Sequence, residues 1–130
     1  LELDAGLAAS LRGHAERLRA TQVRVQTGDA LAGLRSAPPG VWDIVFLDPP
    51  FGDVASGGNE TLFRQALAAA LPLLNAQGWV YLEAPRAWSD EELQVLGLRC
   101  HRHGKAGTVH YHLLTRAAPL TMANGDNPPP

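Results

Sequence analysis

The sequence predicts an α/β fold in which helices cover a largely parallel sheet that ends in an antiparallel hairpin. Amphipathic helical stripes alternate with short apolar runs along the chain, and such alternation favours parallel strands joined by helices. The run at residues 43–47 is apolar after its first acid, which is typical of a strand buried on both faces. Two strand-like runs, at residues 98–103 and 108–115, flank a Gly-Lys-Ala-Gly sequence and indicate the hairpin.

Composition sets the size and class of the protein. The 130 residues are 45% hydrophobic and 18% charged, which is enough apolar material for one compact core. The net charge of −2 excludes a polybasic protein. A single cysteine, Cys100, excludes an intramolecular disulfide and fits a reducing compartment, so we expect a cytoplasmic protein and a small buried thiol. No apolar run approaches the roughly 18 residues that a membrane span needs, so we expect no membrane partner.

The first part of the chain shows the alternation that the fold class requires. We expect short strands at residues 1–4 and 23–26, with a helix over residues 5–20 that Asp4 caps. A turn at residues 28–30 then leads into a short helix at residues 31–34. Because Leu1 lies inside an expected strand, we expect the sequence to be a fragment whose upstream part is missing.

The second part continues the alternation. Residues 52–59 are rich in glycine and indicate a mobile loop, and residues 60–74 predict a helix that Gly78 stops. A strand at residues 79–83 follows. Ser89 and Glu92 have the spacing of a capping box, which predicts a short helix ending by Gly97. We therefore expect one domain over residues 1–116 and a disordered tail, rich in proline, over residues 117–130.

Acidic residues follow the predicted strands at the places where ligands bind in open α/β sheets, beyond the carboxyl ends of the strands. These residues are Glu2, Asp29, Asp48 and Glu83. Each also has a structural alternative, since acids cap helices and end strands in the same positions. Asp43, at the entry of its strand, is expected to be a solvated surface acid.

The sequence Asp48-Pro49-Pro50-Phe51 carries the most specific chemical signal. Two prolines remove two backbone donors in succession, so this corner offers a carboxylate and carbonyl oxygens beside an aromatic ring. Such a corner suits a nucleobase amine: the acceptors hold its two N–H bonds, the ring stacks on the base, and the localised lone pair can attack an electrophilic methyl group. The base has to be unpaired or flipped out. The alternative is a plain Pro-Pro turn with an Asp cap.

The Asp-Pro-Pro-Phe sequence resembles motif IV of the S-adenosylmethionine-dependent amino-methyltransferases. Residues 1–4, 28–30 and 43–51 are similar to the corresponding segments of the bacterial small-subunit ribosomal RNA guanine-N2 methyltransferases of the RsmD type. Residues 78–83 resemble the fifth strand of that family, and residues 105–113 resemble its closing hairpin. The resemblance covers residues 1 to about 116 and implies a Rossmann-like class I methyltransferase sheet.

The resemblance implies S-adenosyl-L-methionine as the cofactor. Glu2 would then bind the ribose hydroxyls, and Asp29 and Ala30 would hold the adenine. The glycine-rich first loop and the first strand of the family would lie upstream of Glu2, so neither is present in this sequence. We therefore expect the isolated chain to bind the cofactor weakly or not at all.

The resemblance also implies a reaction, which is direct in-line methyl transfer to the exocyclic N2 of a guanine in small-subunit ribosomal RNA. Asp48 and Pro49 would orient the amine, Pro50 would complete the rigid corner, and Phe51 would stack on the base. Neither a covalent intermediate nor a metal is expected. Two alternatives remain, an adenine-N6 methyltransferase of nucleic acid and a non-catalytic RNA-binding fragment.

Residues 98–116 concentrate positive charge without any acid. They contain Arg99, Arg102, Lys105 and Arg116 together with four histidines. Such an element serves either to contact a phosphate backbone or to protect a sheet edge, and the sequence leaves both open. Each strand carries one His-x-His pair, and the two histidines of each pair, His101 with His103 and His110 with His112, are expected to share a face. We expect these to be surface histidines rather than metal ligands. The expected partner is ribosomal RNA or the small ribosomal subunit, bound by a monomer.

Overall fold

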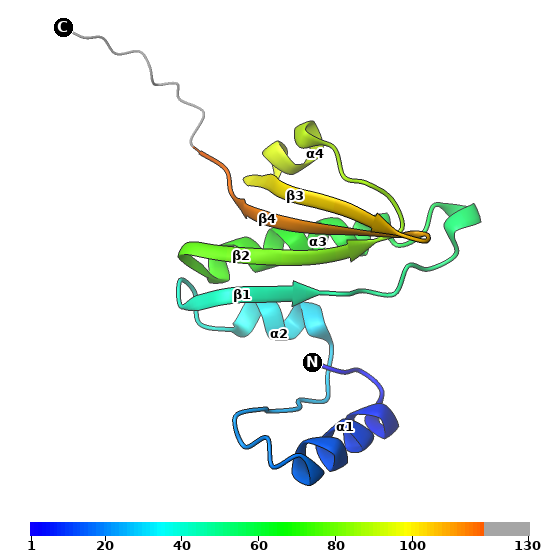
Figure 1. Cartoon of the computed structure of the whole chain (residues 1–130), viewed down its shortest axis with the longest axis vertical. Helices are drawn as coiled ribbons and strands as arrows, with labels where there is room; N and C mark the ends of the chain where they lie inside the picture. Colours follow the sequence, from blue (N-terminus) through cyan, green and yellow to red (C-terminus); the bar gives the residue numbers. More distant parts are fainter. Residues whose placement is uncertain (119–130) are drawn as a thin grey trace, which may run out of the picture. The chain divides into compact units, whose positions relative to one another are not determined.

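The computed structural model describes residues 1–118, which divide into two compact units, one of residues 1–38 and one of residues 39–118. The first unit holds α1 (Ala5–Arg17) and α2 (Ala30–Ser36). The second holds a four-stranded sheet with its helices (Figure 1). Within the described residues, no helix is long and apolar enough to cross a membrane.

In the first unit, the helix forms as predicted and the strands do not. The Asp4 carboxylate accepts the Leu7 N–H at 2.8 Å, which confirms Asp4 as the cap of α1. The prediction of strands at residues 1–4 and 23–26 was wrong, because a single isolated parallel bridge, from Glu2 to Thr27, forms in this unit. Two such short segments form too few backbone bonds to offset the entropy of ordering a ladder within this unit.

The sheet of the second unit is mixed, as a parallel sheet with a terminal hairpin requires. Its strands are β1 (Trp42–Leu47), β2 (Leu74–Ala84), β3 (Leu98–Ala106) and β4 (Val109–Arg116). They lie in the order β1-β2-β4-β3. β1 and β2 are parallel, whereas β4 runs antiparallel to both of its neighbours.

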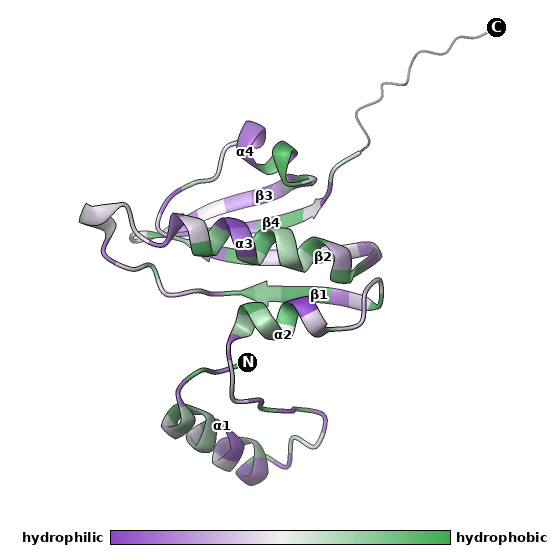
Figure 2. Cartoon of the chain, turned by 180° about the vertical axis from the view of Figure 1, so that it is seen from behind, coloured by the Kyte–Doolittle hydropathy of each residue, from purple (hydrophilic) through white to green (hydrophobic). Residues whose placement is uncertain are grey.

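Helices cover one face of this sheet. α3 (Glu60–Ala70) lies behind β2 and β4 in Figure 1 and in front of them in Figure 2. The short helix α4 (Asp90–Val95) begins with the predicted capping box, in which the Ser89 hydroxyl accepts the Glu92 N–H at 3.2 Å and the Glu92 carboxylate accepts the Ser89 N–H at 2.9 Å. Two single-turn 3₁₀ helices complete the unit, η1 (Val54–Ser56) and η2 (Leu71–Leu73).

The core lies between the sheet and α3, and alternation along the strands separates the two faces of the sheet. Val80 and Leu82 of β2 and Leu114 of β4 are fully buried together with Phe63 and Leu67 of α3. The residues that alternate with them form the opposite face, which we call the open face because none of the helices described within residues 39–118 covers it. It comprises Ile44, Phe46, Trp79, Tyr81, Glu83, Tyr111, Leu113, Thr115, Arg99 and Arg102.

β1 is an edge strand, so the prediction that it is buried on both faces was wrong. Ile44 is 47% exposed and Phe46 is 71% exposed, and only Leu47 of this strand is buried. Among the strands described within residues 39–118, β1 pairs with β2 alone, so one edge of β1 has no partner strand there. Figure 2 shows the hydrophobic residues along the carboxyl half of the strand.

Gly78 was predicted to stop the helix over residues 60–74, and this prediction was wrong. α3 ends at Ala70, and β2 begins at Leu74 and continues through Gly78. The pairing with β1 shifts in this region, because Trp42 lies opposite Leu74 while Ile44 already lies opposite Trp79. A Cβ at Gly78 would lie 2.9 Å from the carbonyl oxygen of Trp42, so the glycine permits close approach of the two strands.

The hairpin has a longer first strand and a tighter turn than predicted. β3 continues to Ala106 and β4 starts at Val109, which leaves Gly107 and Thr108 as the turn. Gly107 has a φ of 61°, as the first central residue of a two-residue hairpin turn requires. Of the predicted tail over residues 117–130, residues 119–130 lie outside the described part of the chain.

Candidate active site

The Asp48–Phe51 corner leaves the sheet directly after β1. Asp48 is exposed, and neither its carboxylate nor the Pro49 carbonyl has a hydrogen-bond partner or ion pair within residues 1–118. The next two carbonyls are occupied, since the Asn59 side-chain amide donates to the Pro50 oxygen at 2.7 Å and the Asn59 N–H donates to the Phe51 oxygen at 3.2 Å. The corner therefore presents two adjacent acceptors that remain available for an external donor.

Asn59 closes the loop that follows the corner. Gly52 has a φ of 73°, and a Cβ there would lie 2.7 Å from the Asn59 side-chain oxygen, so glycine is required beneath this amide. The Asp53 carboxylate accepts the Ala55 N–H at 3.1 Å and the Ser56 hydroxyl at 2.9 Å. The glycine-rich loop predicted as mobile thus has a hydrogen-bonded framework. Asn59 was not predicted as a site residue, since its only signal in the sequence is its place between the loop and α3.

Phe51 is attached to the core by an aromatic series. It is half-buried, with its ring centroid 6.3 Å from that of Phe63, and the Phe63 ring lies 6.4 Å from that of Trp88. The Phe51 ring is therefore held at the margin of the core rather than free in solvent. Its role in stacking on a base stays a prediction.

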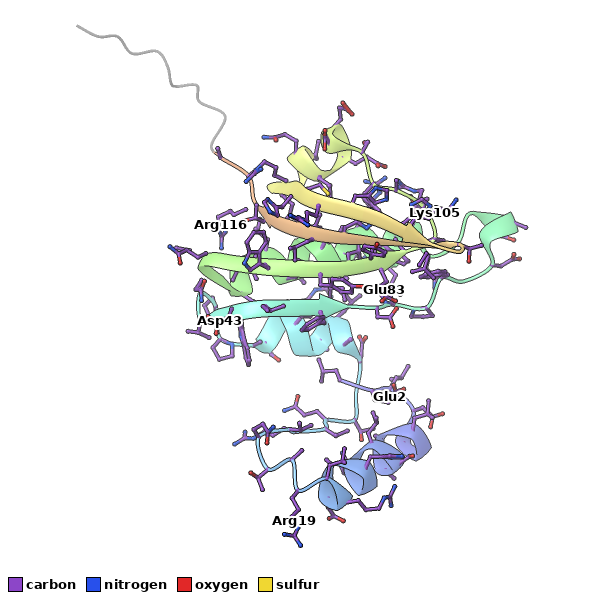
Figure 3. The ribbon with its side chains drawn as sticks, in the orientation of Figure 1. Glu2, Arg19, Asp43, Glu83, Lys105 and Arg116 are labelled. Carbon is purple, nitrogen blue, oxygen red and sulfur yellow. The ribbon has the colours of Figure 1, made fainter. Side chains whose placement is uncertain are left out.

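Polar groups of β2 lie beside the corner on the open face. The Tyr81 hydroxyl donates to the Glu83 carboxylate at 3.2 Å, and the Phe46 ring lies 5.6 Å from the Tyr81 ring. Burial raises the pKa of Tyr81, and the Glu83 carboxylate and the charge of Asp48 raise it further. Figure 3 shows Glu83 toward the carboxyl end of β2. The predicted acid at this strand end is thus engaged with a tyrosine.

The predicted cofactor residues lie in the first unit. The Glu2 carboxylate accepts the Asp4 N–H at 3.0 Å, and the Asp29 carboxylate caps α2 by accepting the Leu31 N–H at 3.2 Å. Ala30 is the first residue of that helix. The bridge from Glu2 to Thr27 brings Glu2 close to the start of α2. A hollow of about 760 Å³ in this unit, lined by α1 and residues 19–26, contains none of the three predicted residues.

A network of two arginines and two glutamates links α3, α4 and the segment that follows β2. Arg86 binds the carboxylates of Glu60 and Glu92, and its guanidinium carbon lies 4.4 Å from the centre of the Trp88 ring. Arg64 binds Glu92 at 3.1 Å and lies 5.0 Å from the same ring. The Arg86 side chain and the backbone N–H of the capping box lower the pKa of Glu92 to about 2. This network was not predicted from the sequence.

The histidines of the hairpin divide differently from the prediction. A bulge between Cys100 and Arg102 turns His101 toward Trp79, with the two ring centroids 5.1 Å apart. The prediction that His101 and His103 share a face was therefore wrong. His103 instead stacks with His110, and their ring nitrogens lie 3.0 Å apart. Among residues 1–118, no group of three or more histidines, cysteines or acids is arranged to hold a metal.

His112 of β4 is a buried structural residue. Its Nε2 accepts the backbone N–H of Trp88 at 3.1 Å, so the ring proton lies on Nδ1. Nδ1 faces the Leu82 carbonyl oxygen at 3.4 Å. Burial lowers the pKa of His112 to about 4. The ring is therefore neutral at pH 7 and fixes the chain before α4 to the sheet.

Comparison with known proteins places the chain in a family. Residues 1–115 match the family described as conserved hypothetical protein 95. A comparison with curated protein sequences gave no match. Since the family match covers nearly the whole chain, it confirms the resemblance that the motif indicated.

Solved structures share the fold. A candidate methyltransferase, yhhF of Escherichia coli, superposes with a TM-score of 0.66 at 24% identity, over 91% of this chain and 61% of its own. A candidate methylase of Haemophilus influenzae gives 0.62 at 23% identity, over 90% of this chain and 70% of its own. TrmN of Thermus thermophilus gives 0.68 at 23% identity, over 88% of this chain and 34% of its own.

At these identities the structural likeness shows the fold alone. This chain spans less than two thirds of the length of the Escherichia coli protein. The mixed four-stranded sheet confirms the predicted α/β class, and it matches the sheet of class I methyltransferases. The chain belongs to the family described as conserved hypothetical protein 95 and has the α/β fold of class I methyltransferases.

Proposed function

We propose that this chain acts in methyl transfer from S-adenosylmethionine to the exocyclic N2 of a guanine in small-subunit ribosomal RNA. The observation that supports this most is the pair of unpartnered acceptors, the Asp48 carboxylate and the Pro49 carbonyl, at the carboxyl end of β1. Ligands of open α/β sheets bind at such strand ends. The family membership and the methyltransferase fold support the same reaction class.

The two acceptors perform the orientation that the reaction needs. The carboxylate of Asp48 and the carbonyl of Pro49 each accept one N–H of the guanine amine, which draws the hydrogens out of the ring plane. The nitrogen lone pair then localises and forms the new N–C bond, while the methyl–sulfur bond breaks and its electron pair stays on sulfur. The amine loses one proton, and the exposed Asp48 carboxylate accepts it or passes it to water.

The first unit carries acceptors that fit the cofactor. Bound S-adenosylmethionine supplies a methyl group made electrophilic by the sulfonium. The carboxylates of Glu2 and Asp29 each bind one backbone N–H through a single oxygen, and the second oxygen of each has no partner within residues 1–118. A carboxylate oxygen of this kind accepts ribose hydroxyls or an adenine amine. We assign Glu2 to the ribose, and Asp29 with Ala30 to the adenine.

The test is methyl transfer from labelled S-adenosylmethionine to unmodified small ribosomal subunits, with the product nucleoside identified by its mass. The chain is assayed beside a version extended at its N-terminus to the length of the Escherichia coli relative. N2-methylguanosine from either version supports the proposal. N6-methyladenosine would assign the chain to adenine methylation. RNA binding without any methylated product would assign it to a non-catalytic binding role.

A further inference from the structure

Glu83 lies level with Asp48 at the carboxyl ends of two adjacent strands. β1 and β2 are parallel, and their register pairs Leu47 with Leu82. The next residues are Asp48 and Glu83, which therefore occupy matching positions on strands about 4.8 Å apart. Figure 3 shows Glu83 near the carboxyl ends of the two strands. The acid of β2 thus belongs to the same end of the sheet as the Asp48–Phe51 corner.

The Tyr81 hydroxyl orients the Glu83 carboxylate and occupies only one of its oxygens. The hydroxyl donates to Oε1 at 3.2 Å, whereas Oε2 has no hydrogen bond or ion pair within residues 1–118. Both side chains are half-buried, and the Phe46 ring packs against the Tyr81 ring. Burial raises the pKa of Tyr81, and the carboxylates of Glu83 and Asp48 raise it further, because both lie near its hydroxyl. One oxygen of Glu83 is therefore held beside Asp48 and remains available for a donor.

The guanine edge that carries the reacting amine presents one donor more than the corner can accept. In the proposed function the Asp48 carboxylate and the Pro49 carbonyl accept the two N–H bonds of the amine. The adjacent ring nitrogen of guanine, N1, carries a hydrogen as well. An N–H that leaves water without gaining an acceptor costs binding free energy, so the site needs a third acceptor at this place. The free oxygen of Glu83 is such an acceptor.

We propose that Glu83 is a specificity-determining residue, whose free oxygen accepts the N1–H of the guanine, and that Tyr81 positions this carboxylate. Asp48 and Pro49 by themselves accept the amine of any base. Adenine has a lone pair at N1 beside its amine, and a carboxylate oxygen repels that lone pair. Glu83 therefore makes the site accept guanine and reject adenine. This inference rests on the proposed function and assigns its choice of base to one residue.

The test compares guanine with 2-aminopurine, which keeps the reacting amine and has a lone pair in place of the N1–H. The parent is the version extended at its N-terminus to the length of the Escherichia coli relative. The methylated guanine is located by mass spectrometry of the product, and small subunits are reassembled with 2-aminopurine at that position. The parent should methylate guanine faster by a factor of about 10² or more. Because 2-aminopurine also lacks the guanine O6, the deciding quantity is the change of this ratio in the variants.

Glu83→Gln should bring the two rates within about tenfold of each other. The amide oxygen of glutamine accepts the N1–H of guanine, and its NH2 group donates to the lone pair of 2-aminopurine, so both bases fit. The matched control is Glu91→Gln, an exposed acid of α4 that forms no ion pair within residues 1–118, and it should keep the ratio of the parent. An unchanged ratio in Glu83→Gln would overturn the proposal, because loss of a purely structural acid lowers both rates alike.

A second variant tests the positioning role of Tyr81. Tyr81→Phe should lower the preference for guanine about tenfold, because the Glu83 carboxylate loses the donor that orients it. Its control is Tyr111→Phe, which removes a hydroxyl without a partner in the described part of the chain and should keep the ratio of the parent. Thermal unfolding of each variant within a few degrees of the parent shows that the fold is intact. A ratio in Tyr81→Phe equal to that of the parent would refute the positioning role.

The same assays separate this inference from the proposed function. Absence of N2-methylguanosine from the parent would refute both. Guanine methylation by the parent, with the same base ratio in Glu83→Gln, would support the proposed function and refute the role of Glu83. Asp48→Asn should lower both rates and keep the ratio, since the two bases share the amine that Asp48 holds.

Discussion

Acidification should destabilise the second unit through one histidine. His112 is 1% exposed, and its Nε2 accepts the Trp88 N–H, so only the neutral ring fits the folded state. Its pKa is about 4 in the folded chain and 6.5 when unfolded. Because the folded pKa is the lower one, the stabilisation is complete above pH 6.5 and is lost as the pH falls from 6.5 to 4.

The magnitude follows from the size of this shift. At pH 5 the His112 ring is protonated in the unfolded chain and neutral in the folded chain. This pH is 1.5 units below the unfolded pKa of 6.5, and at about 1.4 kcal/mol per unit the free energy of unfolding falls by about 2 kcal/mol. Urea unfolding measures this loss between pH 7.5 and 4.5. Tryptophan fluorescence is the readout, because all three tryptophans, Trp42, Trp79 and Trp88, belong to the second unit.

The matched variant is His112→Leu. It removes the acceptor of a buried N–H and should cost about 1–3 kcal/mol at pH 7.5, where the parent is fully stabilised. Its stability should then change less with pH, so that the two curves converge near pH 5. Parallel curves for parent and variant over this range would refute the assignment of the titration to His112.

Three further outcomes follow from the structure. Replacing Arg86 with alanine should destabilise the second unit by about 1 kcal/mol, because it removes two ion pairs and a contact with the Trp88 ring. Urea unfolding measures this loss, and an unchanged midpoint would contradict it. Asn59→Ala should lower methyl transfer and shift the melting temperature little, because it frees the Pro50 carbonyl beside the acceptor pair; full activity would argue against this role. Gly78→Ala should destabilise the sheet by about 1–3 kcal/mol, measured by urea unfolding, because the added methyl meets the Trp42 carbonyl.

Features set by neighbouring residues could be predicted from the sequence. The capping box at Ser89 and Glu92 and the hairpin depend on local spacing, and both formed. The acceptors of the Asp48–Phe51 corner follow from two consecutive prolines, whatever surrounds them. The role of Asn59 could not be predicted in this way, because its amide bonds a carbonyl nine residues away.

Features that depend on neighbours distant in the sequence were missed. An apolar strand such as β1 shows that its side chains can be buried, but not which strands and helices are present to cover it, so its exposure was not foreseen. Gly78 resembled a helix stop because its contact with Trp42 joins two strands far apart in the chain. The bulge that turns Arg102 beside Arg99 depends on the register with β4, which the residue pattern of β3 alone does not determine.

The central claim is that the Asp48 carboxylate orients the amine that receives the methyl group. The most direct test measures methyl transfer to unmodified small ribosomal subunits by the N-terminally extended version, which serves as the parent, and by its Asp48→Asn and Asp43→Asn variants. Asp43→Asn alters an acid at the opposite end of β1. We expect N2-methylguanosine from the parent and from Asp43→Asn, and a rate lower by a factor on the order of 10² for Asp48→Asn. Equal rates for Asp48→Asn and the parent would contradict the claim.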